Sequence, residues 1–254
     1  MPRTIQSIER AAAILRLLSG RTHRLGVVDL AGELGLPKGT VHGLLRTLHH
    51  VGFVEQDPDS GKYQLGAALL HMGSSYLDGN ELRTRALNWS DSLASHTHES
   101  VRIGTLHEGQ VLIVHHVFRP DDSLQTLDVG SLLPAHATAL GKILLAHHPY
   151  AAAEVTRAGL ASFTDATITD PERLDRELAR VRERGWAADI GELHVGQVSC
   201  AAPILDRRGV TVGAMGVFGP PERLLAARQP RGDLLAHVRE AARAVSRELG
   251  AIPW

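Results

Sequence analysis

The sequence has little cysteine, few aromatic residues and no long apolar segment. A single cysteine in 254 residues cannot form an intramolecular disulfide, which is typical of a protein from a reducing compartment. No apolar run approaches the roughly 20 residues that cross a bilayer, and the N-terminal MPRTIQSIER lacks the apolar core of a secretory signal. We therefore predict a cytoplasmic protein without membrane contact. Because Phe, Trp and Tyr make up only 4% of the chain, its core must consist mainly of Leu, Val, Ala and Ile.

Charge is nearly balanced over the whole chain but not along it. The formal net charge is −1, yet residues 1–50 carry seven Lys and Arg against three Asp and Glu. The remaining residues carry 20 basic side chains against 25 acidic ones. A small basic segment joined to a mildly acidic remainder is typical of a DNA-contacting module attached to a second domain.

Three short helices are predicted within the first fifty residues. Apolar residues at helical spacing indicate a helix over 5–19, another over 27–35 and a third over 38–51. Gly35 ends the second helix, and Pro37 in the following turn suits the entry to the third. Two helices joined by such a turn form the helix-turn-helix pattern.

A β-hairpin is predicted directly after these helices. Alternating residues at 53–56 and 62–65 flank Asp-Pro-Asp-Ser-Gly, which is strong turn chemistry. Three helices followed by a hairpin indicate a winged helix-turn-helix, although a small helical bundle with an added hairpin remains an alternative. On the third helix, Arg46 has the geometry to reach a guanine edge, and basic or hydroxyl side chains at the helix start suit phosphates. Each such side chain can equally be a solvated surface residue. The predicted DNA-contacting residues are Lys38, Gly39, Thr40, His42, Gly43, Arg46 and Lys62.

The rest of the chain mixes helices and strands. Helices are expected over 67–77, 81–97, 138–147, from 170 onward and over 233–249, and strands over 101–107, 111–117, 124–129, 200–205 and 210–218. Several strand pairs are joined by short turns, which favours an antiparallel α+β domain.

Three groups of motifs together resemble the IclR family of bacterial transcriptional regulators. They are IQSIERAAAILRLLS with LPKGTVHGLLRTLHHVGFVEQD, then SGKYQLGAALLHMG, and finally LLPAHATALGKILLA, RGWAAD and SCAAPILDRRGVTVGAMGVFG. The resemblance covers nearly the whole chain. It implies a winged helix-turn-helix domain over 1–66, a linker helix over 67–80, and a GAF-like α/β effector-binding and oligomerisation domain over 81–254. It further implies a homodimer or homotetramer that binds double-stranded operator DNA. We favour repression that the ligand relieves, although the family also contains activators.

The resemblance also implies a position for the small-molecule effector, between the sheet and the segment LLPAHATALGK. The residues that match family contact positions, or lie beside them, are Leu133, His136, Ala139, Leu140, Asp189 and Ser199. A helix that begins near Thr138 directs backbone N–H groups into this region, which favours an anion. A narrower resemblance, to family members that control glycerol catabolism, implies glycerol or glycerol 3-phosphate as effector.

Two positions depart from the family pattern. Gly43 stands where recognition helices of the family often carry Arg, so direct readout of DNA is reduced there. Ser199 stands where a cysteine is usual, with Cys200 one residue further on. Neighbouring residues on a strand face opposite sides, so we expect Cys200 to be a buried small side chain rather than a pocket residue.

Other classes of function are less well supported by the residues. The fifteen histidines include adjacent pairs, but no Cys and His set has the spacing of a zinc site, so neither a metal nor a cofactor is predicted. The stretch from His136 to Lys142 lacks the first glycine and the final Ser or Thr of a phosphate-binding loop. An enzyme with a GAF-like fold that acts on a small metabolite is the main alternative, and an accessory interaction protein is a third. The helix-turn-helix disfavours both.

Overall fold

The structure, a computed structural model, describes residues 4–20, 24–121 and 123–251. The chain divides into two units, Met1–Gly79 and Asn80–Trp254. Of the basic N-terminal residues, Arg3, Arg21 and His23 lie outside the described residues. Within the described part of the chain, no helix is both long and apolar enough to cross a membrane.

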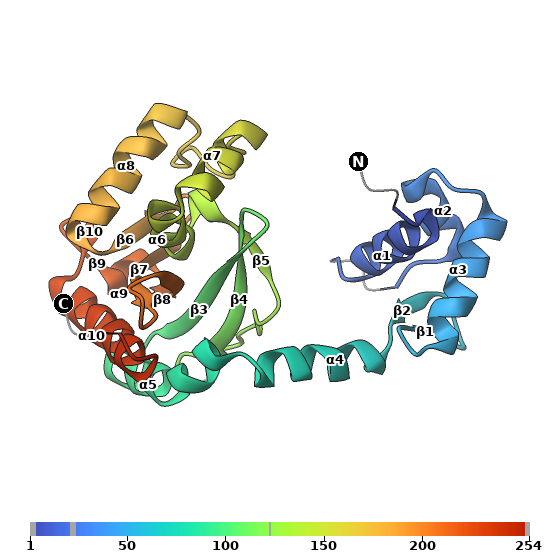
Figure 1. Cartoon of the computed structure of the whole chain (residues 1–254), viewed down its shortest axis with the longest axis horizontal. Coiled ribbons are helices and arrows are strands. Elements are labelled where there is room, and N and C mark those ends of the chain that lie inside the picture. Colours follow the sequence, from blue (N-terminus) through green and yellow to red (C-terminus); the bar gives the residue numbers. More distant parts are fainter. Residues whose placement is uncertain (1–3, 21–23, 122, 252–254) are drawn as a thin grey trace. The chain divides into compact units, whose positions relative to one another are not determined.

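The first unit is a helix-turn-helix with a two-stranded wing (Figure 1). Gly35, in the left-handed conformation at φ 61°, ends α2 and begins the turn. In the wing, Val54 pairs with Leu65 and Gln56 with Tyr63 in an antiparallel register. The elements are α1 (Gln6–Leu18), α2 (Val27–Leu34), α3 (Lys38–His50), β1 (Val54–Gln56), β2 (Tyr63–Leu65) and α4 (Ala67–Asp78).

The core of this unit joins all three helices to the wing. Its fully buried side chains include Ile14 of α1, Leu30 of α2, Leu45 of α3 and Val54 of β1. The helical spacing of apolar residues over 5–19 begins with Ile5 and Ile8 and therefore predicts both on the apolar face of the first helix. Both are instead 63% exposed, because the packed face of α1 is formed further along the helix, by Ile14 and Leu18.

The second unit is built on a six-stranded antiparallel sheet in the order β5-β4-β3-β8-β7-β6. Residues at the centre pair closely: Val101 of β3 faces Val117 of β4 on one side and Val217 of β8 on the other. The strands are β3 (Ser100–His107), β4 (Gln110–Val117), β5 (Leu132–Pro134), β6 (Ala187–Ile190), β7 (Val198–Leu205) and β8 (Thr211–Gly219).

Helices cover both faces of this sheet (Figure 1). Helices α5 (Glu81–Thr97) and α10 (Gly232–Glu248) pack together on one face. The other face carries α6 (Ala139–His147), with α7 (Pro149–Ala158) and α8 (Pro171–Arg184) packed outside it. A 3₁₀ turn, η1 (Ala135–Ala137), precedes α6, and α9 (Pro221–Leu224) with the short strands β9 (Leu225–Ala226) and β10 (Gln229–Pro230) precedes α10. This arrangement is the expected α+β class.

One expected strand is wrong. Residues 124–129 form no strand, and the chain rejoins the sheet only where the Gly130 amide donates to the Ile113 carbonyl. Between residues 124 and 129 the backbone does not pair with a neighbouring strand. Polar side chains of this segment instead form hydrogen bonds and an ion pair with residues of the domain. Gln125 Oε1 accepts from the Arg119 amide at 2.8 Å, and Asp128 forms an ion pair with Arg102.

Candidate functional site

Helix α3 presents one face to the core and the opposite face to solvent. Val41, Leu45 and Leu48 are buried. The predicted DNA-contacting residues Lys38, Gly39, His42 and Arg46 are exposed, and Thr40 and Gly43 are half-buried, so the structure places all six on or beside the open side of one helix. Apart from its chain neighbours and the backbone of its own helix, no described atom lies within 4 Å of where a Cβ would stand on Gly43. The helix backbone is therefore bare at that position.

The wing is held in a fixed turn by its own side chains. Asp57 accepts hydrogen bonds from the amide and hydroxyl of Ser60, and these bonds lower the pKa of Asp57 together with the charge of Arg24, 2.7 Å away. Gly61 adopts φ 66°, a conformation that a side chain would disfavour. Lys62, the predicted wing contact, follows directly and is exposed. The wing therefore holds a free cation beside a rigid turn.

In the second unit a small cavity lies between the sheet and the start of α6. Its volume is about 30 Å³, room for about two water molecules. Five of the six predicted effector residues line it: Leu133, Ala139, Leu140, Asp189 and Ser199. Thr138 also lines the cavity and caps α6 by accepting the Gly141 amide at 3.1 Å. One of the N-terminal amides expected to favour an anion is therefore already paired.

The sixth predicted residue, His136, lies elsewhere. It is buried in η1, its Nε2 is 2.9 Å from the Ala161 carbonyl, and its ring packs beside that of Phe163. The 3₁₀ turn between β5 and α6 thus directs His136 away from a cavity that its chain neighbours enter. Its role as an effector contact is not supported by this placement.

Cys200 is fully buried, and burial raises the pKa of its thiol to about 12, with the charge of Glu99 adding to the effect. Although Cys200 also borders the cavity, its neighbour Ala201 belongs to the cluster packed under α6. Because adjacent side chains on a strand point to opposite faces, the Cys200 thiol faces the α10 side. This thiol is neither ionised nor reactive at neutral pH.

Arg102 is the main residue of this cavity that the sequence does not single out. Its side chain lies on β3 with the guanidinium carbon 3.3 Å from the centre of the Phe218 ring, and it forms an ion pair with Asp128. Burial lowers the pKa of Arg102, and its Nε has no hydrogen-bond partner among the described residues. The only sequence signal is a charge inside an otherwise apolar strand, VRIGTL.

His116 on β4 shares this environment. Its Nδ1 is 3.1 Å from the Asp128 amide and 3.6 Å from the Asp128 carboxylate. Burial, followed by the positive charge of Arg102, lowers the pKa of His116 to about 4. The imidazole is therefore neutral at pH 7 and accepts the Asp128 amide, which leaves Arg102 as the cation that faces the cavity.

Asp189 supplies the opposite charge. It is buried at the end of β6, where its Oδ1 accepts the Glu192 amide at 2.7 Å and its Oδ2 lies 3.5 Å from the Ser199 hydroxyl. Burial raises the pKa of Asp189 to about 6, and the negative charge of Glu192 adds to the rise. A guanidinium and a carboxyl group thus border one small cavity, together with the hydroxyls of Thr138 and Ser199.

No group of three or more His, Cys, Asp or Glu side chains suitable for a metal ion occurs in the described ranges. The cavity's chemistry is hydrogen bonding and charge recognition. Its polar groups are of the kinds that recognise an anionic group and hydroxyls.

Comparison with known proteins links both units to one family. Residues 7–58 match the IclR helix-turn-helix domain, and residues 74–247 match the C-terminal domain of bacterial IclR transcriptional regulators. The glycerol operon regulatory protein of Streptomyces coelicolor is 56% identical over 251 residues, which cover 99% of each chain.

Two solved structures are also similar. The crystal structure of an IclR transcriptional regulator from Alicyclobacillus acidocaldarius superposes with a TM-score of 0.81 at 28% identity, covering 98% of this chain and all of that one. An IclR homologue from Microbacterium hydrocarbonoxydans, complexed with 4-hydroxybenzoate, gives a TM-score of 0.81 at 26% identity, with 96% and 99% coverage.

Proposed function

This chain belongs to the IclR family of bacterial transcriptional regulators, and from that premise we propose that it is a repressor of glycerol catabolism whose operator affinity falls when glycerol or glycerol 3-phosphate binds. The chain is a DNA-binding regulator with an effector domain, which removes the enzyme alternative. The operator, the effector, the direction of control and the assembly are proposals. They rest on α3, on the cavity that borders α6, and on the name of the Streptomyces relative.

The exposed face of α3 supports the proposal that the protein binds a specific operator. Arg46 lies in the middle of that face, where a guanidinium can donate two hydrogen bonds to a guanine edge in the major groove. Lys38 and Thr40 at the helix start suit phosphates, as does Lys62 on the wing. The bare backbone at Gly43 permits close approach of α3 to DNA. Base readout therefore depends on few side chains, with Arg46 foremost.

The DNA-binding test is a fluorescence-anisotropy titration of the protein against its own upstream DNA and against random DNA, at two salt concentrations. We expect sequence-preferring binding that weakens steeply with salt, because phosphate contacts release counterions. Arg46→Ala should cost about 1–3 kcal/mol on the specific site. Arg16→Ala, an exposed arginine of the same unit on α1, should leave affinity unchanged. Equal affinities of R46A and R16A for the specific site would show that Arg46 is a solvated surface residue that does not contact DNA.

The effector proposal rests on the groups that border the small cavity. Arg102 can bind a phosphate or carboxylate, and Asp189 and Ser199 can bind hydroxyls. Glycerol 3-phosphate carries both kinds of group. The relative crystallised with 4-hydroxybenzoate holds a molecule that also combines an anionic group with a hydroxyl. Because the cavity has room for only about two waters, a ligand of this size must displace side chains when it enters.

This displacement supplies the mechanism. Arg102 is already paired with Asp128 on the segment between β4 and β5, so an anionic ligand competes with Asp128 for the guanidinium. A ligand shifts the operator affinity only if it binds the DNA-competent and incompetent forms unequally. Couplings of about 1–3 kcal/mol correspond to about 5- to 150-fold changes in affinity. We propose that the effector favours the form in which the Arg102–Asp128 pair is broken.

The effector test measures release of the operator complex by glycerol 3-phosphate and by glycerol. We expect Arg102→Gln, which removes the pair with Asp128, to weaken operator binding in the absence of effector. It should also raise the glycerol 3-phosphate concentration needed to release the remaining complex about tenfold or more. Arg83→Gln, a partly buried arginine outside the cavity, serves as the control. A response of R102Q equal to that of wild type would place the effector elsewhere, and no response of the operator-bound wild type to either compound would refute the glycerol proposal.

The proposed assembly is a homodimer. Helix α4 has no buried residue, and Leu70, Met72 and Tyr76 on it are 75%, 56% and 57% exposed. A second copy would cover these apolar side chains, and two recognition helices would then read the half-sites of a near-palindromic operator. Sedimentation equilibrium should give two chains per particle, and four chains would show that dimers pair into a tetramer.

A further inference from the structure

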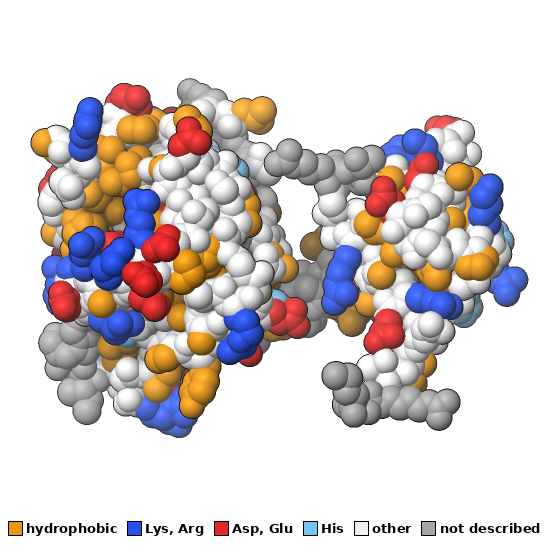
Figure 2. All heavy atoms as spheres, turned by 90° about the horizontal axis from the view of Figure 1, so that it is seen from above, with side chains coloured by type: hydrophobic (Ala, Val, Ile, Leu, Met, Phe, Trp, Pro, Cys, Tyr) orange, Lys and Arg blue, Asp and Glu red, His pale blue; other side chains and the backbone are white. Residues whose placement is uncertain are grey.

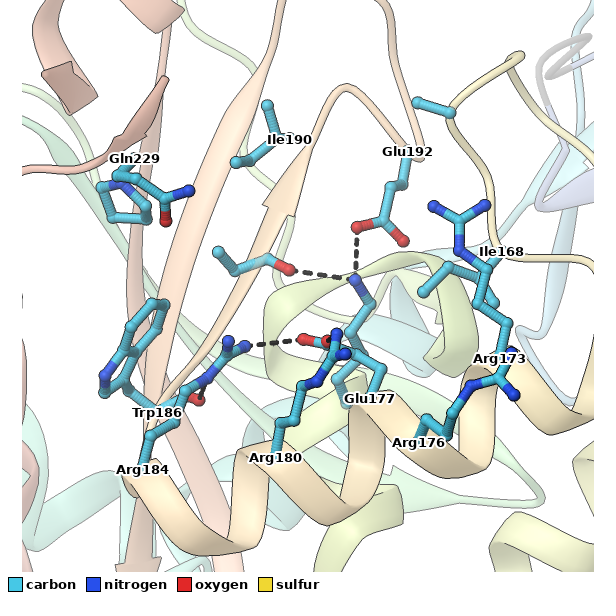
Figure 3. A pocket seen from close by; sticks show the side chains of 14 residues that line it. Ile168, Arg173, Arg176, Glu177, Arg180, Arg184, Trp186, Ile190, Glu192 and Gln229 are labelled. Atoms are coloured by element: carbon cyan, nitrogen blue, oxygen red, sulfur yellow. Dashed lines mark hydrogen bonds and ion pairs between the residues drawn. The ribbon is translucent and has the colours of Figure 1, made fainter. Parts of the chain in front are cut away.

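A second and larger hollow lies between α8 and β6, with a volume of about 530 Å³. We call it the α8 cleft. Figure 3 shows the arginines of α8 along one wall, with Trp186 next to Arg184, and Gln229 and Glu192 on the opposite side. A buried lysine, Lys142, also lines the cleft. None of the predicted effector residues lines it.

The charge in the α8 cleft is unbalanced. Its lining carries five cations, of Arg173, Arg176, Arg180, Arg184 and Lys142, against two carboxylates, of Glu177 and Glu192. Figure 2 looks onto the face that carries α8, where Lys and Arg side chains gather with acidic ones among them. The excess of positive charge favours an anion in this hollow.

Not all of these arginines are already engaged. Arg184 donates to Glu177 at 2.6 Å, and Arg180 lies 3.8 Å from the same carboxylate. Arg176 reaches only Glu172, at 3.8 Å with both side chains exposed, and Arg173 has no acidic partner within the described ranges. Exposed pairs at such distances contribute about 0–1 kcal/mol. The guanidiniums of Arg173 and Arg176 are therefore available to a ligand.

At the floor of the cleft lies a buried polar network in which one acceptor has no hydrogen-bond donor within the described part of the chain. Lys142 is 1% exposed, and its ammonium donates to the Ala188 carbonyl at 2.9 Å and to Glu192 Oε1. The other carboxylate oxygen, Glu192 Oε2, is buried and has no hydrogen-bond partner among the described residues. A buried acceptor without a donor is costly and uncommon in folded proteins. A ligand hydroxyl would satisfy it once the Glu192 side chain shifts to bring Oε2 to the surface of the cleft.

From these observations we infer that the α8 cleft is a second ligand site, for a small phosphate ester that carries hydroxyl groups. The phosphate is held by Arg173 and Arg176, whose planar guanidiniums suit phosphate oxygens. A hydroxyl of the same molecule donates to Glu192 Oε2. The combination of free cations and one buried acceptor distinguishes this site from a solvated row of arginines, which would lack the acceptor.

The two cavities share one short segment of chain. The Ala188 carbonyl accepts from Lys142, Asp189 lines the small cavity, and the Glu192 amide donates to Asp189 at 2.7 Å. A ligand that shifts the main chain at Glu192 would therefore also move the Asp189 carboxyl group, which faces the other cavity. If the proposed effector site holds, the two ligands are coupled, and each changes the affinity of the other by the same factor, about 5- to 150-fold for typical couplings.

The test is isothermal titration calorimetry of the full chain with ribose 5-phosphate and with inorganic phosphate. We expect ribose 5-phosphate to bind more tightly than phosphate, because its sugar hydroxyls can donate to Glu192 while its phosphate group stays on Arg173 and Arg176. The double variant Arg173→Gln/Arg176→Gln should lose about tenfold or more in affinity. Its matched control is Arg157→Gln/Arg247→Gln, two exposed arginines on α7 and α10 outside the cleft. Both double variants change exposed side chains, and their melting temperatures should equal that of wild type.

Two results would overturn the inference: no binding of ribose 5-phosphate to wild type, or equal affinity of the two double variants. Loss of binding in Arg102→Gln but not in Arg173→Gln/Arg176→Gln would also overturn it, since the ligand would then occupy the small cavity. The outcome is separable from that of the proposed function. If glycerol 3-phosphate does not release the operator complex while ribose 5-phosphate binding still depends on Arg173 and Arg176, the effector proposal alone fails.

Discussion

Replacing Asp189 with Asn should stabilise the effector unit at neutral pH. Asp189 is 6% exposed, and burial raises the pKa of its carboxyl from 3.8 to about 6. At pH 7.5 the group is therefore ionised in a site that disfavours its charge. Asparagine keeps the shape and the acceptor for the Glu192 amide, 2.7 Å away, and removes the charge.

The magnitude follows from the pKa. Each pKa unit is worth about 1.4 kcal/mol, so ionised Asp189 lowers the free energy of unfolding by about 3 kcal/mol at pH 7.5. The folded-state pKa lies above the unfolded value, so the folded protein binds the proton more tightly and gains stability as pH falls through 6 towards 3.8. By pH 5 about half of the penalty, roughly 1.5 kcal/mol, has gone. The advantage of the Asn variant should shrink in the same way.

The assay is urea unfolding of wild type and Asp189→Asn between pH 5 and pH 7.5, followed by far-UV circular dichroism. Asp175→Asn, an exposed aspartate on α8, is the control and should follow wild type at every pH. A variant that gains about 3 kcal/mol at pH 7.5 and about half of that at pH 5 supports the assignment. A pH-independent difference, or a variant less stable than wild type at pH 7.5, would refute the reasoning, because the charge would then be stabilised where it stands.

Two further predictions concern packing and charge in the same unit. Gly141→Ala should destabilise the effector unit by about 1–3 kcal/mol or more in thermal melting, because its Cβ would lie 2.1 Å from the Ala135 carbonyl oxygen. The control is Gly73→Ala on α4, where no described atom outside its chain neighbours and the helix's own backbone lies within 4 Å of the new Cβ. In the same experiment it should be neutral or stabilising by up to about 1 kcal/mol. Lys142→Met should cost about 3–5 kcal/mol in urea unfolding, since it leaves the Glu192 carboxylate buried without its cation. Lys142→Met/Glu192→Gln should recover much of that loss, and a double variant no more stable than the single one would contradict the charge argument.

The first unit could be predicted from sequence because its signals are local. The helices begin and end within a few residues of the predicted bounds, since periodicity, Gly35 and Pro37 act on adjacent residues. The local pattern mispredicts burial only where tertiary packing determines which apolar residues are covered. Ile5 and Ile8 fit the helical stripe but extend beyond the part of α1 that contacts α2 and α3, so they stay exposed.

In the second unit the same reasoning is less complete, because its contacts join distant segments. The alternation of apolar and polar residues over 124–129 resembles a strand. In the structure Asp128 forms an ion pair with Arg102, and the edge of β4 pairs with Leu132–Pro134 instead. His136 lies within the motif that borders the cavity, yet a single 3₁₀ turn directs it toward Ala161. Arg102 enters the cavity from a strand about thirty residues before that motif, and nothing local marks it.

The ion pair of Lys142 and Glu192 shows why such a site needs the structure. The two residues are 50 positions apart, and although Lys142 ends the segment LLPAHATALGK, nothing local pairs it with Glu192. A buried ion pair is a weak source of stability, because apolar side chains of similar volume serve as well or better. Here the pair is also incomplete, with one carboxylate oxygen unpartnered at the floor of a cationic cleft. Stability does not account for that arrangement. A ligand that supplies the missing donor does, and the Glu192–Asp189 hydrogen bond then carries its effect to the other cavity.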